Sequence, residues 1–260
     1  MRTLIAMIRS LITIIFFASY LSVFIIFSVL TFRRWSLRLT GPYLRFFGRA
    51  SFKILGVELS FKTDWPFTHD QPCVIIVNHQ STLDVLLAAS ICPNRVGAIG
   101  KKELIWVPFM NLAWWSMRLF LVDRSNHEAA VRTIKEVTEN TLKYERAVML
   151  APEGTRSKTG DMLPFKKGAF HIALQGKLPI YPVVFSGAAE AMPKHTFWAY
   201  PTPIQAHFLP PISTADWTRE TLDQHIAAIQ QDMNKAYLAL RSEMNLPLLP
   251  SQMNDEVSPQ

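Results

Sequence analysis

The chain has 260 residues, enough to bury a full core and to hold one large domain with an appendage. Its 27 Lys and Arg residues exceed its 20 Asp and Glu residues, which gives a formal net charge of +7. With only two cysteines, Cys73 and Cys92, the sequence excludes a disulfide framework and a cysteine-based zinc site. We expect both cysteines to be small buried side chains in a reducing compartment.

The first predicted element is an uncharged apolar run from Leu11 to Phe32. It exceeds the roughly 20 residues with which a helix crosses the core of a bilayer. A secretory signal is the competing interpretation, but the run is long for one and no small-residue cleavage site follows it. The basic pair Arg33-Arg34 directly after the run favours a membrane-bound protein whose remaining chain lies on the cytoplasmic face, as at a bacterial inner membrane.

The same run also fits a helix that lies within one leaflet, paired with a second amphipathic helix after a break at Gly41-Pro42. The sequence does not decide between a helix that spans the bilayer and one that lies within a single leaflet. Between residues 33 and 53 the chain carries basic and aromatic side chains and no acidic one, which favours an anionic membrane surface over nucleic acid as the partner. The basic residues of this segment are Arg33, Arg34, Arg38, Arg45, Arg49 and Lys53.

From about residue 60 onward, short apolar runs alternate with helical patterns of period 3.6. Continuous apolar runs predict strands buried on both faces. The alternation predicts an α/β fold with a mostly parallel central sheet flanked by helices. The predicted strands are Val74 to Val77, Ala147 to Leu150, Ile180 to Phe185 and Gln205 to Leu209; the predicted helices are Leu83 to Ser90, with a start at Ser81 or Thr82, then Ala129 to Tyr144, Ala169 to Gln175 and Thr218 to Met244.

Two polar motifs each follow a predicted strand. Asn78-His79 comes after the first strand and Pro152-Glu153 after the second. Loops at the carboxyl ends of parallel strands are where such folds hold their chemistry, so we expect the two motifs to face each other at one edge of the sheet.

The first motif places His79 five residues before Asp84. A neutral imidazole removes a proton from an alcohol best when an acceptor holds its other ring N–H, and Asp84 is in position to be that acceptor. The alternative is structural: Ser81-x-x-Asp84 is a capping-box pattern, in which the carboxylate only caps the helix. A His-x4-Asp spacing by itself is common, so this motif depends on its context.

The second motif, Glu153-Gly154-Thr155-Arg156, fits an ordinary turn with solvated charges, or a loop whose arginine binds a phosphate with paired hydrogen bonds. Neither a Gly-x-Ser-x-Gly elbow nor a metal-ligand spacing is present, and His171 and His225 fall on helix patterns where a structural or exposed role is expected. Direct attack by a substrate hydroxyl is therefore favoured over a covalent acyl-enzyme. Further cations stand in turn-like positions at Lys101, Lys102, Arg124, Lys166 and Lys167.

At this point four blocks, in order, resemble the glycerolipid acyltransferases, the family of bacterial 1-acyl-glycerol-3-phosphate acyltransferase. Leu163 to Ala169 also resembles the family segment that follows its third block, and the likeness spans roughly residues 74 to 212. Two positions depart from the family pattern. Ala151 stands where an aromatic residue often precedes Pro-Glu-Gly, and Asn111 stands where a glycine often follows Pro-Phe. The four blocks are Asn78-His79-x4-Asp84, Gly100 to Arg124, Pro152 to Ser157 and Leu178 to Val184.

The resemblance implies roles for these residues. His79 is the general base on the sn-2 hydroxyl and Asp84 orients it. Lys101, Arg124 and Arg156 bind the glycerol phosphate, in a loop shaped by Glu153, Gly154 and Thr155. Pro182 belongs to the acyl-donor side. The co-substrate is acyl-CoA or acyl-carrier protein, with no metal and no further cofactor.

The patterns above and the resemblance together predict three parts: membrane-binding helices with a basic interface segment over residues 1–58, an acyltransferase domain over 59–246, and a polar, proline-containing tail over 247–260 that we expect to be frayed. The product is phosphatidic acid, made from a lysolipid acceptor in the membrane. Two alternatives stay open at this stage. One is an acyltransferase for another lysophospholipid or a lyso-aminolipid, and the other is a membrane-anchored lipid-binding protein without activity.

Overall fold

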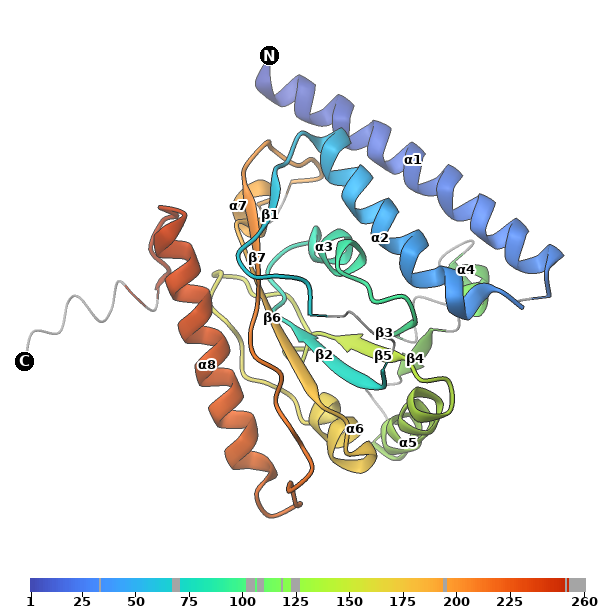
Figure 1. Ribbon diagram of the computed structural model, residues 1–260. Coiled ribbons are helices and arrows are strands. Elements are labelled where there is room, and N and C mark those ends of the chain that lie inside the picture. Colours follow the sequence, from blue (N-terminus) through green and yellow to red (C-terminus); the bar gives the residue numbers. More distant parts are fainter. Residues whose placement is uncertain are drawn as a thin grey trace, which may run out of the picture.

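A computed structural model describes residues 1–32, 34–66, 71–101, 106, 110–117, 119–122, 127–193, 196–250 and 252. Helices cover both faces of a seven-stranded sheet, so the predicted α/β class is confirmed (Figure 1). The strands are β1 (Leu59–Phe61), β2 (Cys73–Val77), β3 (Val96–Lys101), β4 (Phe120–Val122), β5 (Ala147–Leu150), β6 (Ile180–Ser186) and β7 (Ile204–Phe208). The helices are α1 (Arg2–Leu30), α2 (Ser36–Leu55), α3 (Asp84–Ser90), α4 (Met110–Met117), α5 (His127–Lys143), α6 (Gly168–Gly176), α7 (Ala188–Ala191) and α8 (Leu222–Glu243).

The sheet has the order β1-β7-β6-β2-β5-β3-β4, and every neighbouring pair is parallel except β6 with β7. β2 lies at its centre between β6 and β5. All five β2 side chains are buried, as the continuous apolar run predicts. A mostly parallel sheet places the loops after β2, β5 and β6 at one edge.

The pleat of β2 divides the core into two layers. Cys73, Ile75 and Val77 pack with the side chains of α2 and α3, whereas Val74 and Ile76 pack with those of α5, α6 and α8. Figure 1 shows this arrangement, with α2 and α3 above the sheet and α5 and α6 below it. Neighbouring residues of one strand therefore support opposite faces of the molecule.

The N-terminal helix α1 starts at Arg2, ahead of the uncharged run with which it was predicted to begin. It folds back on α2 as an antiparallel pair (Figure 1). Aromatic rings hold the pair together: Tyr20 stacks on Tyr43 with ring centroids 3.8 Å apart, and Phe16 stacks on Phe47 at 5.7 Å. Within the described residues, α1 is the helix long and apolar enough to cross a membrane, with a mean hydropathy of 2.4.

The break predicted at Gly41-Pro42 is wrong, because α2 continues through Pro42. The Gly41 N–H donates a hydrogen bond to a partner outside the helix, the Asn94 carbonyl oxygen, at 3.2 Å. A Cβ on Gly41 would lie 1.7 Å from the Pro93 carbonyl oxygen, so glycine is required by a close approach. The Gly-Pro pair thus marks where α2 contacts the turn after α3, and not where a helix ends.

Two of the basic side chains expected on the membrane surface also make contacts inside the protein. Arg45 donates to Asn94 Oδ1 at 3.0 Å and lies over the Trp65 ring. Arg49 donates to the Ser90 carbonyl oxygen at 3.3 Å. Arg45 and Arg49 therefore attach α2 to the sheet domain. They are less available for contact with a membrane surface than the sequence suggests.

The predicted ends of two C-terminal segments are also corrected. Helix α8 starts at Leu222 and not at Thr218, because Thr218 and Thr221 close a turn with each other's backbone N–H groups. The tail predicted to be frayed from residue 247 is packed at its start, since Leu249 is buried in the core beside α8. Arg241 fixes the same segment by donating to the Pro247 carbonyl oxygen at 2.7 Å.

Candidate active site

The two motif loops leave neighbouring strands at one edge of the sheet. β2 and β5 are parallel, and their last paired residues are Ile76 and Leu150. Asn78 is the first residue after β2 and Ala151 the first after β5, so the two loops begin within one residue of the same height. Asn78 also bridges to β6: its side chain accepts from the Phe185 N–H at 2.7 Å and donates to the Phe185 carbonyl at 2.9 Å. The convergence predicted from the sequence is therefore present.

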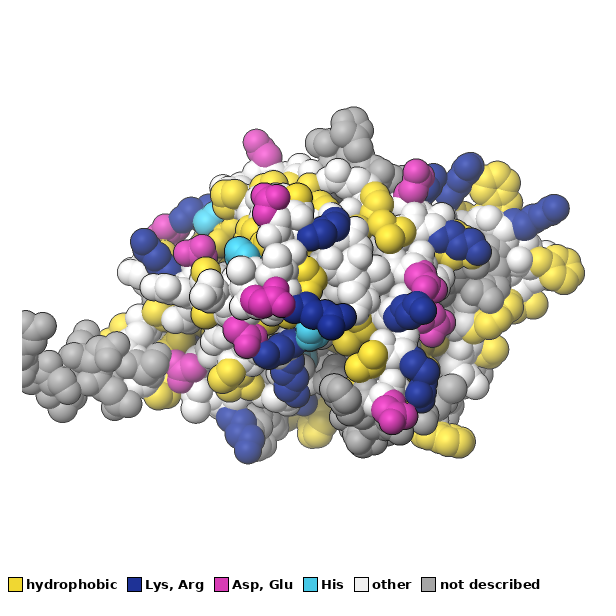
Figure 2. Space-filling model, turned by 90° about the horizontal axis from the view of Figure 1, so that it is seen from below, with side chains coloured by type: hydrophobic (Ala, Val, Ile, Leu, Met, Phe, Trp, Pro, Cys, Tyr) yellow, Lys and Arg dark blue, Asp and Glu magenta, His cyan; other side chains and the backbone are white. Residues whose placement is uncertain are grey.

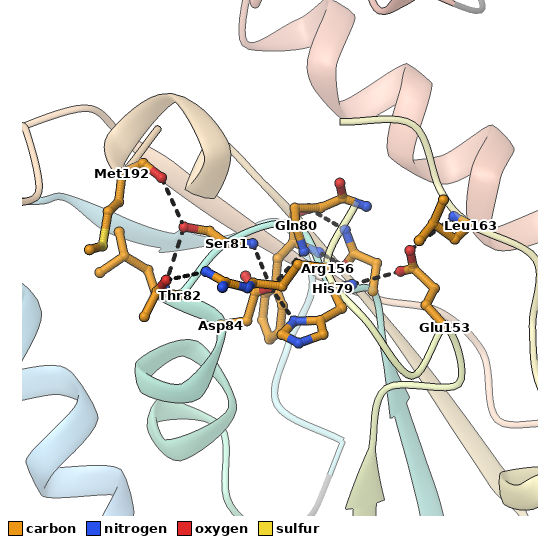
Figure 3. A network of polar contacts seen from close by, with 12 residues as sticks. His79, Gln80, Ser81, Thr82, Asp84, Glu153, Arg156, Leu163 and Met192 are labelled. Atoms are coloured by element: carbon orange, nitrogen blue, oxygen red, sulfur yellow. Dashed lines mark hydrogen bonds and ion pairs between the residues drawn. The ribbon is translucent and has the colours of Figure 1, made fainter. Parts of the chain in front are cut away.

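His79 and Asp84 are in contact, with Nδ1 of the ring 2.8 Å from Asp84 Oδ2 (Figure 3). The same oxygen accepts the backbone N–H groups of Gln80 at 2.6 Å and Ser81 at 2.8 Å. Because three donors surround one carboxylate oxygen, Nδ1 of His79 carries the proton and the ring's other nitrogen, Nε2, keeps its lone pair. Asp84 is buried, whereas the His79 side chain is 28% exposed, so a substrate can reach the ring.

The structural alternative for Asp84 is true at the same time. Ser81 Oγ accepts from the Leu83 N–H at 3.3 Å, while Asp84 accepts the Ser81 N–H, as in a capping box at the start of α3. One carboxylate therefore ends the loop, starts the helix and orients the histidine. The orientation of the ring is fixed by the same hydrogen bonds that form the local backbone.

Glu153 holds the backbone of His79 and does not face outward. Its Oε1 accepts the His79 N–H at 2.7 Å, and its Oε2 accepts the Leu163 N–H at 2.9 Å. The Ser157 N–H in turn donates to the His79 carbonyl at 3.1 Å. The loop after β5 thus binds both polar backbone groups of the histidine. We call this arrangement of Glu153, Ser157 and the His79 backbone the Glu153 clamp.

Burial governs the electrostatics of this clamp. Glu153 is 1% exposed, and loss of hydration raises the pKa of its carboxyl to about 7, against the lowering effect of the two backbone N–H donors. The negative charge of Asp84 raises it further, as a smaller effect. A carboxyl group in these surroundings acts as a buried connector between the two loops.

Arg156 is the exposed cation of the second motif. Its Nη1 lies 2.5 Å from Thr82 Oγ1, so it extends over the first motif loop on one side of the histidine, with Glu153 on the other (Figure 3). Gly154 has φ of +70°, and a Cβ there would lie 3.0 Å from Lys166 Nζ. A glycine is needed because the turn is left-handed and Lys166 passes over it.

The structure separates the remaining predicted site residues. Thr155 is exposed and adjoins Arg156. Pro182 is buried inside β6, where it pairs with Ile76 of β2. Lys101 ends β3, but its side chain lies outside the described residues, as does Arg124. The phosphate-binding roles of these two cations, and the acyl-donor role of Pro182, stay predictions.

The two cysteine thiols and the possible metal-binding clusters can be assessed in the described part of the chain. Burial raises the pKa of the Cys73 and Cys92 thiols to about 12, so neither is a nucleophile at neutral pH. Among the same residues no three His, Cys, Asp or Glu side chains lie together in a way that could hold a metal ion. What this edge of the sheet offers is a proton acceptor, a positioned carboxylate and an exposed guanidinium.

A hollow of about 710 Å³ adjoins the histidine. Its walls come from α5, α6 and the ends of β3 and β5, and they are mostly apolar. No pattern in the sequence predicts this hollow, although α5 carries the apolar stripe expected of a helix packed on a sheet. The lining side chains include His79, Ile99, Val131, Ile134, Ala151, Pro152, Lys166, Lys167, His171 and Ile172.

Comparisons with known proteins cover the part of the chain that holds this candidate site. The family model described as Acyltransferase matches residues 58–186, which include both motif loops. The chain is 40% identical over 156 residues to a 1-acyl-sn-glycerol-3-phosphate acyltransferase from Cocos nucifera, covering 60% of this chain and 51% of that relative. It is 34% identical over 181 residues to a protein of that name, form alpha, from Mus musculus, covering 69% of this chain and 64% of the relative. The chain thus spans about half to two thirds of the length of these relatives.

A solved structure has the same fold over nearly the whole chain. The crystal structure of the 1-acyl-sn-glycerophosphate acyltransferase PlsC from Thermotoga maritima superposes with a TM-score of 0.75 and covers 93% of this chain and 98% of that one. The sequence identity is 21%, so the match concerns the fold.

Proposed function

The chain belongs to the acyltransferase family, and on that premise we propose that it transfers a fatty acyl group to the sn-2 hydroxyl of 1-acyl-glycerol-3-phosphate. The product is phosphatidic acid and the acyl donor is a thioester, acyl-CoA or acyl-carrier protein. One observation carries the proposal: the His79 ring, held 2.8 Å from Asp84, lies on a loop that Arg156 overlies from the neighbouring strand.

The proposed reaction uses the free nitrogen of His79 as a base. Nε2 accepts the proton of the sn-2 hydroxyl while that oxygen attacks the carbonyl carbon of the thioester. The C–S bond then breaks, and the proton held on His79 passes to the leaving thiolate. Asp84 keeps Nδ1 protonated throughout and stabilises the imidazolium that forms, and proton transfer of this kind contributes about 10² to 10⁴ in rate.

The acceptor is held through its phosphate. Arg156 is exposed, lies beside the base and presents a planar fork of N–H donors that matches a phosphate. Its hydrogen bond to Thr82 is to a neutral hydroxyl, so a doubly charged phosphate competes for it effectively. Lys101 and Arg124 complete the phosphate site in this proposal, on the strength of the sequence motif.

The lysolipid acceptor reaches this site from a membrane against which α1 lies. Near its N-terminus Arg9 and Ser10 bond to Leu55 and Ala199, and farther along Tyr20 bonds to Tyr43. A helix attached to its own protein over this length cannot cross a bilayer separately, which supports a helix in one leaflet. Its outward side chains are Leu4, Ile5, Ile8, Leu11, Ile12, Ile15, Val23, Ile26 and Leu30.

The experiment that tests the proposed function is a panel of lysolipid acceptors with one radiolabelled acyl donor. The panel contains 1-acyl-glycerol-3-phosphate, lysophosphatidylcholine, lysophosphatidylethanolamine and a lyso-aminolipid in mixed micelles. We expect label in phosphatidic acid well above the other products. Equal label in a zwitterionic product would contradict phosphate recognition, and consumption of thioester for none of them would contradict the activity itself.

A further inference from the structure

The hollow beside His79 continues into a second one along the same helices. The second hollow measures about 600 Å³ and shares three lining residues with the first: Val131 and Ile134 of α5, and His171 of α6. It ends at the turn before α8, where Trp217, Thr218 and Arg219 form its wall. The two hollows thus lie end to end along α5 and α6, from the candidate base to the turn before α8, and we refer to them together as the channel.

The channel changes character along its length. Lys166 and Lys167 line the channel in its first hollow, and Lys167 is paired with Asp223 at 2.6 Å. Near the middle the walls are the apolar side chains of Val131, Ile134 and Ile172, and the far end carries Lys177 and Arg219. Figure 2 shows this face of the molecule, with Lys and Arg side chains interspersed among hydrophobic ones. A linear ligand that fits it is therefore weakly polar along its length and anionic at its outer end.

The cations at the outer end are held in place by the fold. Lys177 Nζ donates to the carbonyl oxygens of Ala215 at 2.8 Å and Trp217 at 2.9 Å. An ammonium group has three donors, so one stays available for a ligand. Burial lowers the pKa of His171, the charges of Lys167 and Arg219 lower it further, and Asp223 opposes them, so the charge of Arg219 at the outer end still acts on the wall that the two hollows share.

The acceptor phosphate is proposed to bind elsewhere. Arg156 and its partner Thr82 are not among the described side chains that line either hollow. Since both substrates must meet at His79, and Arg156 marks the acceptor side, the channel is left for the acyl donor. This step depends on the proposed function.

We propose that the channel binds acyl-CoA, with the thioester carbonyl at His79, the pantetheine arm between α5 and α6, and its phosphates at Lys177 and Arg219. The walls of the outer part are mostly apolar, with Leu174 and Trp217 among them, but its end carries Lys177 and Arg219. A ligand that ends in phosphates pairs with these two cations, which an acyl chain cannot do. An acidic carrier protein is disfavoured because Glu220 and Asp223 lie close to Arg219 and His171 there. Lys177 and Arg219 can each bind one phosphate group of a small ligand, whereas an acidic protein would need a broad positive surface.

A binding measurement tests the outer end without relying on turnover. Calorimetry of CoA binding to the full chain in detergent compares wild type, Arg219→Glu and Lys235→Glu. Lys235 is an exposed cation on α8, so the control makes the same change of net charge. We expect Arg219→Glu to weaken CoA binding about five- to tenfold and Lys235→Glu to leave it within about twofold. Equal dissociation constants for the two variants would overturn the assignment of the phosphate end.

A second pair of variants tests the middle of the channel. Val131 and Leu142 are similarly exposed on α5, at 47% and 45%, but of the two Val131 lines both hollows. We expect Val131→Trp to raise the KM for palmitoyl-CoA several-fold with the KM for the lysolipid unchanged, and Leu142→Trp to change neither. An increase of the lysolipid KM in Val131→Trp would place the acceptor, and not the donor, in the channel.

The outcomes separate this inference from the proposed function. CoA binding that responds to Arg219→Glu, together with no acyl transfer to any lysolipid, would leave the channel in place and overturn the reaction. Turnover with acylated carrier protein but none with palmitoyl-CoA would leave the reaction in place and overturn the channel's occupant.

Discussion

The Glu153 clamp makes a prediction that joins stability, pH and activity. In Glu153→Gln one carboxylate oxygen is replaced by an amide NH2 group, which cannot accept. Either the His79 N–H, now 2.7 Å from its acceptor, or the Leu163 N–H at 2.9 Å then loses its buried partner. Leaving one buried N–H without a partner costs about 1–3 kcal/mol. A protonated carboxyl differs from the amide because its hydroxyl oxygen still has acceptor capacity.

The pKa of Glu153 sets the pH dependence of this effect. Burial raises it from 4.5 to about 7, so between these values the folded protein holds a proton that the unfolded chain has released. Unfolding free energy therefore falls as pH rises through this window, by about 3 kcal/mol in total at about 1.36 kcal/mol per pKa unit, and is level above it. This slope is absent from Glu153→Gln, which cannot titrate.

Denaturant unfolding of both proteins at pH 5 and pH 8 measures the difference. At pH 5 we expect the variant to be less stable by about 1–3 kcal/mol. At pH 8 the wild type contains a buried charge and has lost about 3 kcal/mol, so we expect the difference to vanish or to reverse sign. Turnover should be reduced at both pH values, since the His79 backbone is no longer held. Glu139→Gln, an exposed change on α5, is the control. Equal pH slopes in wild type and Glu153→Gln, or unchanged turnover, would refute the clamp.

Two further variants test other parts of the account. Arg156→Ala should raise the apparent KM for the lysophosphatidic acceptor about tenfold and change kcat less. Arg132→Ala, which removes an exposed arginine on α5, is the control and should have no effect. An unchanged acceptor KM in Arg156→Ala would contradict a role of Arg156 in phosphate binding. Gly41→Ala should lower the free energy of unfolding by about 1–3 kcal/mol or more, because its Cβ meets the Pro93 carbonyl, whereas Gly168→Ala, which has open space, should not; equal stability of the two would show that α2 can move away.

The elements that the sequence predicted are those with an uninterrupted pattern. β2 and β5 are short apolar runs in a sheet covered on both faces, and such burial requires no polar alternation. β3 was not predicted because it contains Gly97 and Gly100, which weaken any strand pattern. Gly41-Pro42 misled the prediction for a related reason. Its glycine serves a contact with the turn after α3, more than 50 residues away in the chain, which no local pattern records.

The candidate site was predictable in its residues and less so in their tasks. The sequence placed His79 and Asp84 together, but it offered capping and orientation as alternatives, whereas the same carboxylate oxygen does both. Glu153 looked like part of an anion-binding turn, and only the folded backbone shows it bonded to the His79 and Leu163 N–H groups. The channel could not be predicted, because it arises where α5 and α6 pack side by side.

The central claim is that the His79 imidazole, oriented by Asp84, removes the proton from the acceptor hydroxyl. It is tested most directly by the turnover of purified His79→Ala with palmitoyl-CoA and 1-acyl-glycerol-3-phosphate, after circular dichroism and thermal unfolding have shown that the variant is folded. We expect kcat to fall by about 10² to 10⁴, with the acceptor still bound. A folded His79→Ala protein with turnover near that of the wild type would contradict the mechanism.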